Sequence, residues 1–86
     1  MRKKKKILNL VDRNKSEILY YTSKYPDGQQ DFYITGDLYN IKEYNVIIHS
    51  RMNNWLDIEM IILANQSLKE SGCKDISLYS PSFLVF

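Results

Sequence analysis

Cysteine, histidine and tryptophan each occur only once among the 86 residues of this chain. The single cysteine, Cys73, excludes an internal disulfide, gives no support to a thiolate metal site, and fits the reducing cytoplasm. Long apolar runs are missing too. A secretory leader needs roughly 7–15 apolar residues and a membrane-spanning helix about 18, but the run at Ile7 and Leu8 is interrupted by Asn9. We therefore expect a cytoplasmic protein without a membrane span.

Positive charge is concentrated at the N-terminal end. Residues 2–6 supply five of the twelve basic residues, so the remainder carries seven basic against ten acidic side chains. Such a cluster can mark a nucleic-acid or membrane surface. No aromatic residue is interleaved with it to stack on bases. We interpret residues 1–6 as a basic solvated tail and predict neither a nucleic-acid nor a membrane partner.

The first half of the chain has the pattern of strands joined by turns. Residues 7–11 predict a short buried strand. Residues 18–25 and 32–35 are rich in β-branched and aromatic side chains and predict two paired strands. Between them, Pro26-Asp27-Gly28 is typical of a tight turn, because Pro presets φ and Gly accepts a positive φ. The sequence therefore predicts a hairpin.

The second half predicts a strand, a helix and a further strand. Residues 44–49 have an apolar centre, as in a central strand of a parallel sheet. Asn53 or Asn54 is a suitable N-cap, and Gly72 a suitable terminator, for a helix between them. Residues 76–79 predict the next strand. One apolar helical stripe is expected from the spacing of Leu56, Met60, Leu63, Ala64 and Leu68.

These elements predict an α/β fold built from a hairpin and one βαβ unit. Crossovers of this kind join parallel strands. Ligands of such sheets bind beyond the carboxyl ends of the strands. Here those ends are residues 49–51 and 80–83, which makes His49 a conceivable base, although no partner carboxylate lies near it in sequence.

Four segments in this order form a recognisable series: the turn Tyr25-Pro26-Asp27-Gly28-Gln29, the Val-Ile-Ile strand at 46–48, the helix Leu-Ala-Asn-Gln-Ser-Leu-Lys-Glu-Ser-Gly at 63–72, and Ile-Ser-Leu-Tyr-Ser-Pro-Ser-Phe at 76–83. The series resembles the amino-terminal part of the ribose-phosphate pyrophosphokinases, also called phosphoribosyl diphosphate synthetases. The resemblance covers residues 25–86, about a quarter of a full-length family member. It implies that residues 7–86 form an incomplete N-terminal domain of phosphoribosyltransferase-like, Rossmann-like type.

The resemblance also implies an activity and a site. Family members use Mg²⁺ to transfer the diphosphoryl group of ATP to ribose 5-phosphate, which supplies nucleotide biosynthesis. They usually assemble as homo-oligomers in which the hairpin turn of one subunit contributes to the adenine pocket of its neighbour. The family's aromatic, carboxylate or amide, and glutamate residues of that turn correspond by position to Tyr25, Asp27 and Gln29. A ring can stack on a purine, and the polar groups can bond to its edge.

Two departures limit what the resemblance implies. Gln29 stands where the family has a glutamate. The sequence also ends at Phe86, at or just before the loop with which family members grip the ATP phosphates. Because positioned cations and metal dominate phosphoryl transfer, we predict that this chain alone has no catalytic residues, holds no metal and is not catalytic.

Two other functions remain open from the sequence. The chain could be a stand-alone, non-catalytic module that binds nucleotide or a synthetase subunit. It could also be a small nucleic-acid binder that acts through residues 2–6, which requires affinity that falls steeply with salt.

Overall fold

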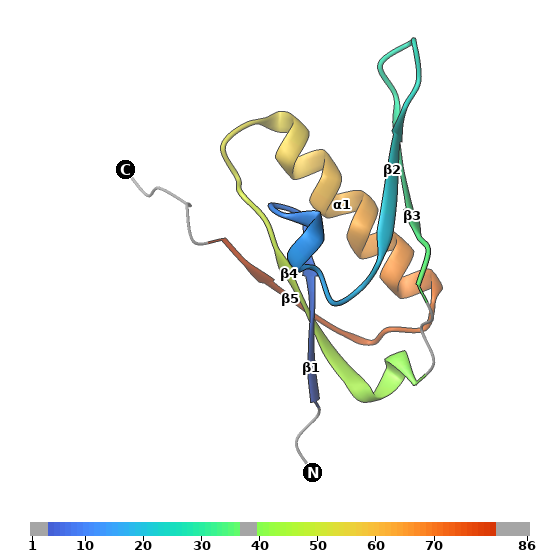
Figure 1. The fold of residues 1–86 in the computed structure, drawn as a ribbon, viewed down its shortest axis with the longest axis vertical. Coiled ribbons are helices and arrows are strands. Elements are labelled where there is room, and N and C mark those ends of the chain that lie inside the picture. Colours follow the sequence, from blue (N-terminus) through green and yellow to red (C-terminus); the bar gives the residue numbers. More distant parts are fainter. Residues whose placement is uncertain (1–3, 37–39, 81–86) are drawn as a thin grey trace.

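The computed structural model describes residues 4–36 and 40–80. They form a small mixed α/β domain with a parallel three-stranded sheet, a separate hairpin and one α-helix (Figure 1). In chain order the elements are β1 (Lys4–Asn9), the 3-10 turn η1 (Arg13–Lys15), β2 (Tyr20–Lys24), β3 (Gln30–Ile34), the 3-10 turn η2 (Ile41–Glu43), β4 (Tyr44–His49), α1 (Trp55–Glu70) and β5 (Asp75–Tyr79).

The sheet has the order β1-β4-β5, and both strand pairs are parallel. Its register places Leu8 beside Ile48, and Ile48 beside Leu78. The predicted βαβ unit is confirmed, because α1 connects the parallel neighbours β4 and β5. The position of β4 in the middle also confirms the central strand that its apolar residues predicted.

The predicted hairpin is confirmed in β2 and β3. Their antiparallel register pairs Tyr20 with Ile34 and Lys24 with Gln30. The turn closes through a hydrogen bond of 2.9 Å from the Gly28 N–H to the Tyr25 carbonyl. Gly28 has a φ of 92°, the left-handed conformation for which glycine was expected here.

Both predicted ends of α1 are confirmed. Asn54 is the N-cap, and its side chain accepts a hydrogen bond from the Asp57 N–H. Gly72 has a φ of 98° and donates its N–H to the Lys69 carbonyl, while Cys73 donates to the carbonyl of Leu68. These two bonds form the Schellman arrangement that ends many helices.

The core lies on one face of the sheet, beneath α1 and the base of the hairpin. Alternate residues of a strand point to opposite faces, and Leu8, Val46 and Ile48 supply the buried face of the sheet. In Figure 1, α1 runs between the sheet and β3, and the end of the hairpin extends past it. The remaining buried apolar residues are Ile18, Tyr20, Phe32, Ile41, Ala64, Leu68 and Cys73.

The first strand begins earlier than predicted. Lys4, Lys5 and Lys6 pair with Tyr44, Asn45 and Val46 of β4 instead of lying in the solvent-exposed tail. Pairing satisfies the backbone groups that face β4 while the charged ends stay near water. The Lys6 Nζ lies 4.9 Å from the centre of the Tyr44 ring. The rest of the predicted tail, residues 1–3, lies outside the described residues, as do 81–86.

The prediction that Leu56 belongs to the buried stripe of α1 is wrong. Its side chain is 50% exposed, whereas Ala64 and Leu68 are buried. The first turn of α1 is exposed at Trp55 as well as at Leu56. The helix is also apolar on more than one side, with Ile62 46% exposed. Spacing alone therefore could not identify the face that packs.

Candidate functional site

The predicted site residues lie at the tip of the hairpin, away from the body of the domain (Figure 1). Tyr25, Asp27 and Gln29 are all exposed, and the Tyr25 side chain has 44% of its surface in contact with solvent. The structure brings the three residues together on one turn. A ligand that reaches the tip from outside would meet them before any other part of the hairpin.

Hydrogen bonds hold the backbone of this turn in place. The Tyr25 N–H donates to the Gln29 carbonyl at 2.8 Å. One carboxylate oxygen of Asp27 accepts the Gln29 N–H at 3.1 Å, as short polar side chains do in turns. Part of the accepting capacity of Asp27 is therefore used within the turn, and its second oxygen has no partner among the described residues.

The Tyr25 ring is anchored by a neighbouring carboxylate. A hydrogen bond with Asp31 is the main cause that raises the pKa of Tyr25 above its ordinary value, with a smaller contribution from a hydrogen bond with Tyr33. The Tyr33 hydroxyl in turn donates to Asp31 Oδ2 at 3.0 Å. The Tyr25 hydroxyl is thus held by its own hairpin, while the ring remains exposed.

The site predicted from the sequence did not include Asp31 and Tyr33. Alternate side chains of a strand point to the same face, so the sequence already implied that residues 31 and 33 share one face of β3. What the sequence did not contain was the register that places Tyr25 beside that face.

A second candidate lies at the carboxyl ends of β1 and β4, where ligands of parallel sheets were expected. Two adjoining compartments, of about 130 and 280 Å³, share Leu10, Val11 and Met60 as lining residues. We call them together the carboxyl-end cleft. The smaller compartment is completed by Ser50, Arg51 and Asp57, and the larger by Arg13, Tyr20 and Thr22.

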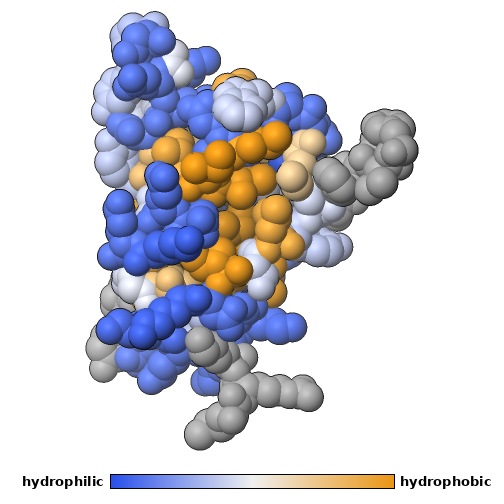
Figure 2. All heavy atoms as spheres, turned by 180° about the vertical axis from the view of Figure 1, so that it is seen from behind, coloured by the Kyte–Doolittle hydropathy of each residue, from blue (hydrophilic) through white to orange (hydrophobic). Residues whose placement is uncertain are grey.

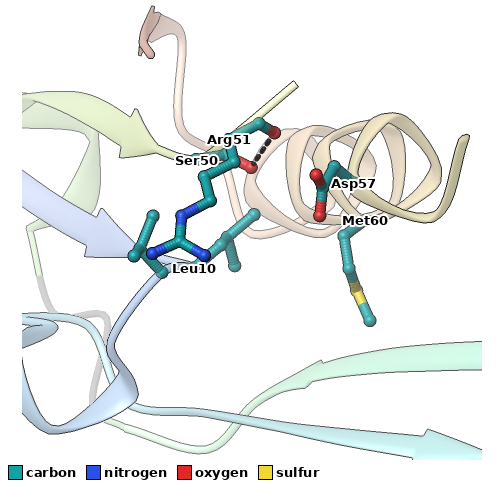
Figure 3. A pocket seen from close by; sticks show the side chains of 6 residues that line it. Leu10, Ser50, Arg51, Asp57 and Met60 are labelled. Atoms are coloured by element: carbon teal, nitrogen blue, oxygen red, sulfur yellow. Dashed lines mark hydrogen bonds between the residues drawn. The ribbon is translucent and has the colours of Figure 1, made fainter. Parts of the chain in front are cut away.

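The side chains of the smaller compartment come from three elements. Figure 3 shows Arg51 extending beside Leu10, with Asp57 and Met60 facing the same space from the first turns of α1. The Ser50 hydroxyl is turned inward and donates to the Arg51 carbonyl at 2.9 Å. Asp57 Oδ2 accepts the Asn53 N–H at 3.1 Å, so the carboxylate is fixed at the helix start.

The loop that carries Arg13 is ordered by side-chain caps. Asn9 Oδ1 accepts the N–H groups of Val11 and Asp12, at 3.0 and 2.8 Å. Asp12 Oδ1 then accepts the N–H of Asn14 at 3.0 Å and caps η1. These bonds fix the backbone on both sides of Arg13, which lines the larger compartment.

The strand ends that carry the cleft are also joined to one another. Leu10 donates its N–H to the His49 carbonyl at 2.8 Å, and Ser50 donates to the Tyr79 carbonyl at 3.1 Å. The sheet hydrogen bonding therefore continues one residue beyond β1 and β4. The spacing between the two loops of the cleft follows from the sheet.

His49 does not line the carboxyl-end cleft. Its ring lies 4.9 Å from the ring of Tyr79, which is its neighbour in the parallel register. Because Ile48 points into the core, the adjacent His49 points to the other face of the sheet. The sequence located the strand edge with Ser50 and Arg51, but it missed Arg13 and Asp57.

In residues 4–36 and 40–80, no three His, Cys, Asp or Glu side chains gather as a possible metal site, and no helix is long and apolar enough to cross a membrane. Comparisons with protein-family models, curated proteins and solved structures found no match for this chain.

Proposed function

We propose that this chain is the amino-terminal portion of a protein of ribose-phosphate pyrophosphokinase type, and that its hairpin tip forms one wall of a purine pocket completed by a neighbouring subunit. Tyr25 stacks on the adenine of ATP, and Asp27 and Gln29 bond to its polar edge. The chain contributes to binding and is not catalytic by itself. ATP and Mg²⁺ belong to the reaction of the complete enzyme.

The observation that carries this proposal is the presentation of the Tyr25 ring. The ring is exposed at the end of a projecting hairpin, while its hydroxyl is held by Asp31. A side chain that is hydrogen-bonded to its own hairpin before binding loses less conformational entropy when a base stacks on its ring. The ordered turn supports the same role, as does the Asp27 oxygen that has no partner in the described part of the chain.

A titration of the full chain with ATP tests this function. We expect amide shifts in the ¹⁵N spectrum at residues 25–29, and a loss of about tenfold in affinity for Tyr25→Ala, because stacking on an aromatic ring contributes roughly 1–3 kcal/mol per base. Tyr25→Phe keeps the ring and removes only the hydroxyl that bonds to Asp31, so its loss of affinity should be smaller than that of Tyr25→Ala. Unchanged affinity in Tyr25→Ala would rule out the purine wall.

The second candidate is a stand-alone module that binds a protein subunit without catalysis. It is favoured by the apolar surface on the side opposite the viewer of Figure 1, where hydrophobic side chains gather in the middle of the face (Figure 2). Exposed aliphatic residues include Leu56 and Ile62 of α1 and Leu78 of β5. Large exposed apolar patches mark sites of interaction with other proteins. On mixing, a module of this class changes the sedimentation of an intact synthetase; unchanged sedimentation excludes it.

A further inference from the structure

The carboxyl-end cleft combines two arginines with apolar lining residues. Arg13 and Arg51 line adjoining compartments that share Leu10, Val11 and Met60 as lining residues. Within the described part of the chain, neither guanidinium has a hydrogen bond or an ion pair. Their donors are therefore available to a ligand in the cleft.

Two arginines around one cleft favour a phosphate group. The planar guanidinium offers paired N–H donors that match the oxygens of phosphate, and such charge-assisted bonds are stronger than neutral ones. Their loops are built before any ligand arrives, by the Asn9 side-chain bonds on one side and the sheet bonds of Leu10 and Ser50 on the other. A preorganised site of this kind loses little entropy on binding.

The carboxylate of Asp57 sets a second requirement for the ligand of the cleft. It faces the cleft from α1 (Figure 3), and among the described residues only Oδ2 has a partner, the Asn53 N–H. A carboxylate repels a phosphate placed next to it, but it accepts hydrogen bonds from hydroxyl groups. The compartments, at about 130 and 280 Å³, fit a small molecule.

We propose that the carboxyl-end cleft binds a small phosphorylated polyol. The phosphate lies against Arg13 and Arg51, a hydroxyl donates to Asp57, and the carbon chain packs on Leu10 and Met60. This site is separate from the hairpin tip and does not depend on the purine wall.

Glycerol 3-phosphate is the probe, with inorganic phosphate and glycerol as the partial ligands. In a ¹⁵N titration of the full chain, we expect shifts at residues 10–13 and 50–57, and binding at least about tenfold tighter for glycerol 3-phosphate than for either partial ligand. Arg13→Gln and Arg51→Gln each weaken binding about tenfold, and Arg51→Lys weakens it less. Lys15→Gln is the matched control, because Lys15 is an exposed base of the same 3-10 turn that does not line the cleft.

Asp57→Asn tests the polyol part alone. It keeps the phosphate contacts and reduces the preference for glycerol 3-phosphate over inorganic phosphate. Equal affinity for the two ligands in the native chain would overturn the proposal. So would shifts that persist in both arginine variants, or that appear at residues 25–29 instead. Shifts at 25–29 with ATP and none in the cleft with glycerol 3-phosphate would overturn this site and leave the purine wall standing.

Discussion

The Tyr20 hydroxyl donates a hydrogen bond of 2.7 Å to the backbone carbonyl of Asn9. This bond joins the hairpin to the end of β1, beside the loop that carries Arg13. The ring itself is stacked on Phe32, with 5.2 Å between the ring centres. One residue of the hairpin therefore connects the core to the rim of the carboxyl-end cleft.

Tyr20→Phe keeps the ring and removes this bond. We expect a loss of about 1 kcal/mol in the free energy of unfolding, the usual net contribution of one hydrogen bond. Urea denaturation monitored by circular dichroism measures it. Tyr21→Phe, at an exposed position of the same strand, is the control and should have no measurable effect.

The same tyrosine makes the fold sensitive to alkali. Burial is the main cause that raises the pKa of Tyr20 above its ordinary value of 10.0, and nearby Arg13 opposes the shift. Above pH 10.0 the unfolded chain loses this proton while the folded chain retains it, so stability falls as pH rises until the folded pKa is passed. Denaturation at increasing pH should show a smaller loss in Tyr20→Phe than in the native chain. Equal losses in the two proteins would show that Tyr20 is not responsible.

Asn53 and Asn54 are adjacent, but only one side chain caps α1. The Asn54 side chain accepts the Asp57 N–H at 3.0 Å, whereas Asn53 contributes its backbone N–H to Asp57. We expect Asn54→Ala to cost about 1 kcal/mol of unfolding free energy and Asn53→Ala to cost less. Thermal denaturation of the two variants distinguishes them. A larger effect of Asn53→Ala would show that the cap is assigned to the wrong residue.

Gly28 sets the shape of the hairpin tip. Its φ of 92° is strained for a residue with a side chain, and nothing lies within 4 Å of an added Cβ, so backbone strain is the only cost of a substitution. Gly28→Ala should lose about 1 kcal/mol, and Gly28→Asn less, because asparagine tolerates positive φ better than alanine. Denaturation measures both, and an unchanged midpoint in Gly28→Ala would contradict the turn geometry.

The apolar surface should make the native chain associate. Leu56 and Ile62 on α1 are exposed apolar side chains. We expect Leu56→Glu with Ile62→Glu to move the sedimentation coefficient toward that of the monomer. Gln66→Glu adds charge at another exposed position of α1 and serves as the control. A native chain that sediments as a monomer at every concentration would contradict this expectation.

Local chemistry accounts for most of the fold that the sequence predicted. Pro26 and Gly28 determined the turn, Asn54 and Gly72 the ends of α1, and the apolar centre of β4 its place in the sheet. The boundary of β1 was missed because pairing with β4, rather than any property of the lysines, makes Lys4–Asn9 a strand.

The candidate sites were less predictable because they depend on contacts between distant residues. Arg13 and Asp57 are 44 positions apart and line adjoining compartments only because β1 and β4 pair in parallel. Asp31 reaches Tyr25 through the hairpin register. Composition and spacing indicated the strand edge and the turn, but not the side chains that complete either site.

The central claim is that Tyr25 forms a wall for a purine. Nuclear Overhauser effects between the protons of bound ATP and the protein measure it directly. We predict contacts from the adenine H2 and H8 protons to the ring protons of Tyr25. Contacts of adenine to Val11 or Met60 in the carboxyl-end cleft, or none to Tyr25 when ATP is bound, would contradict it.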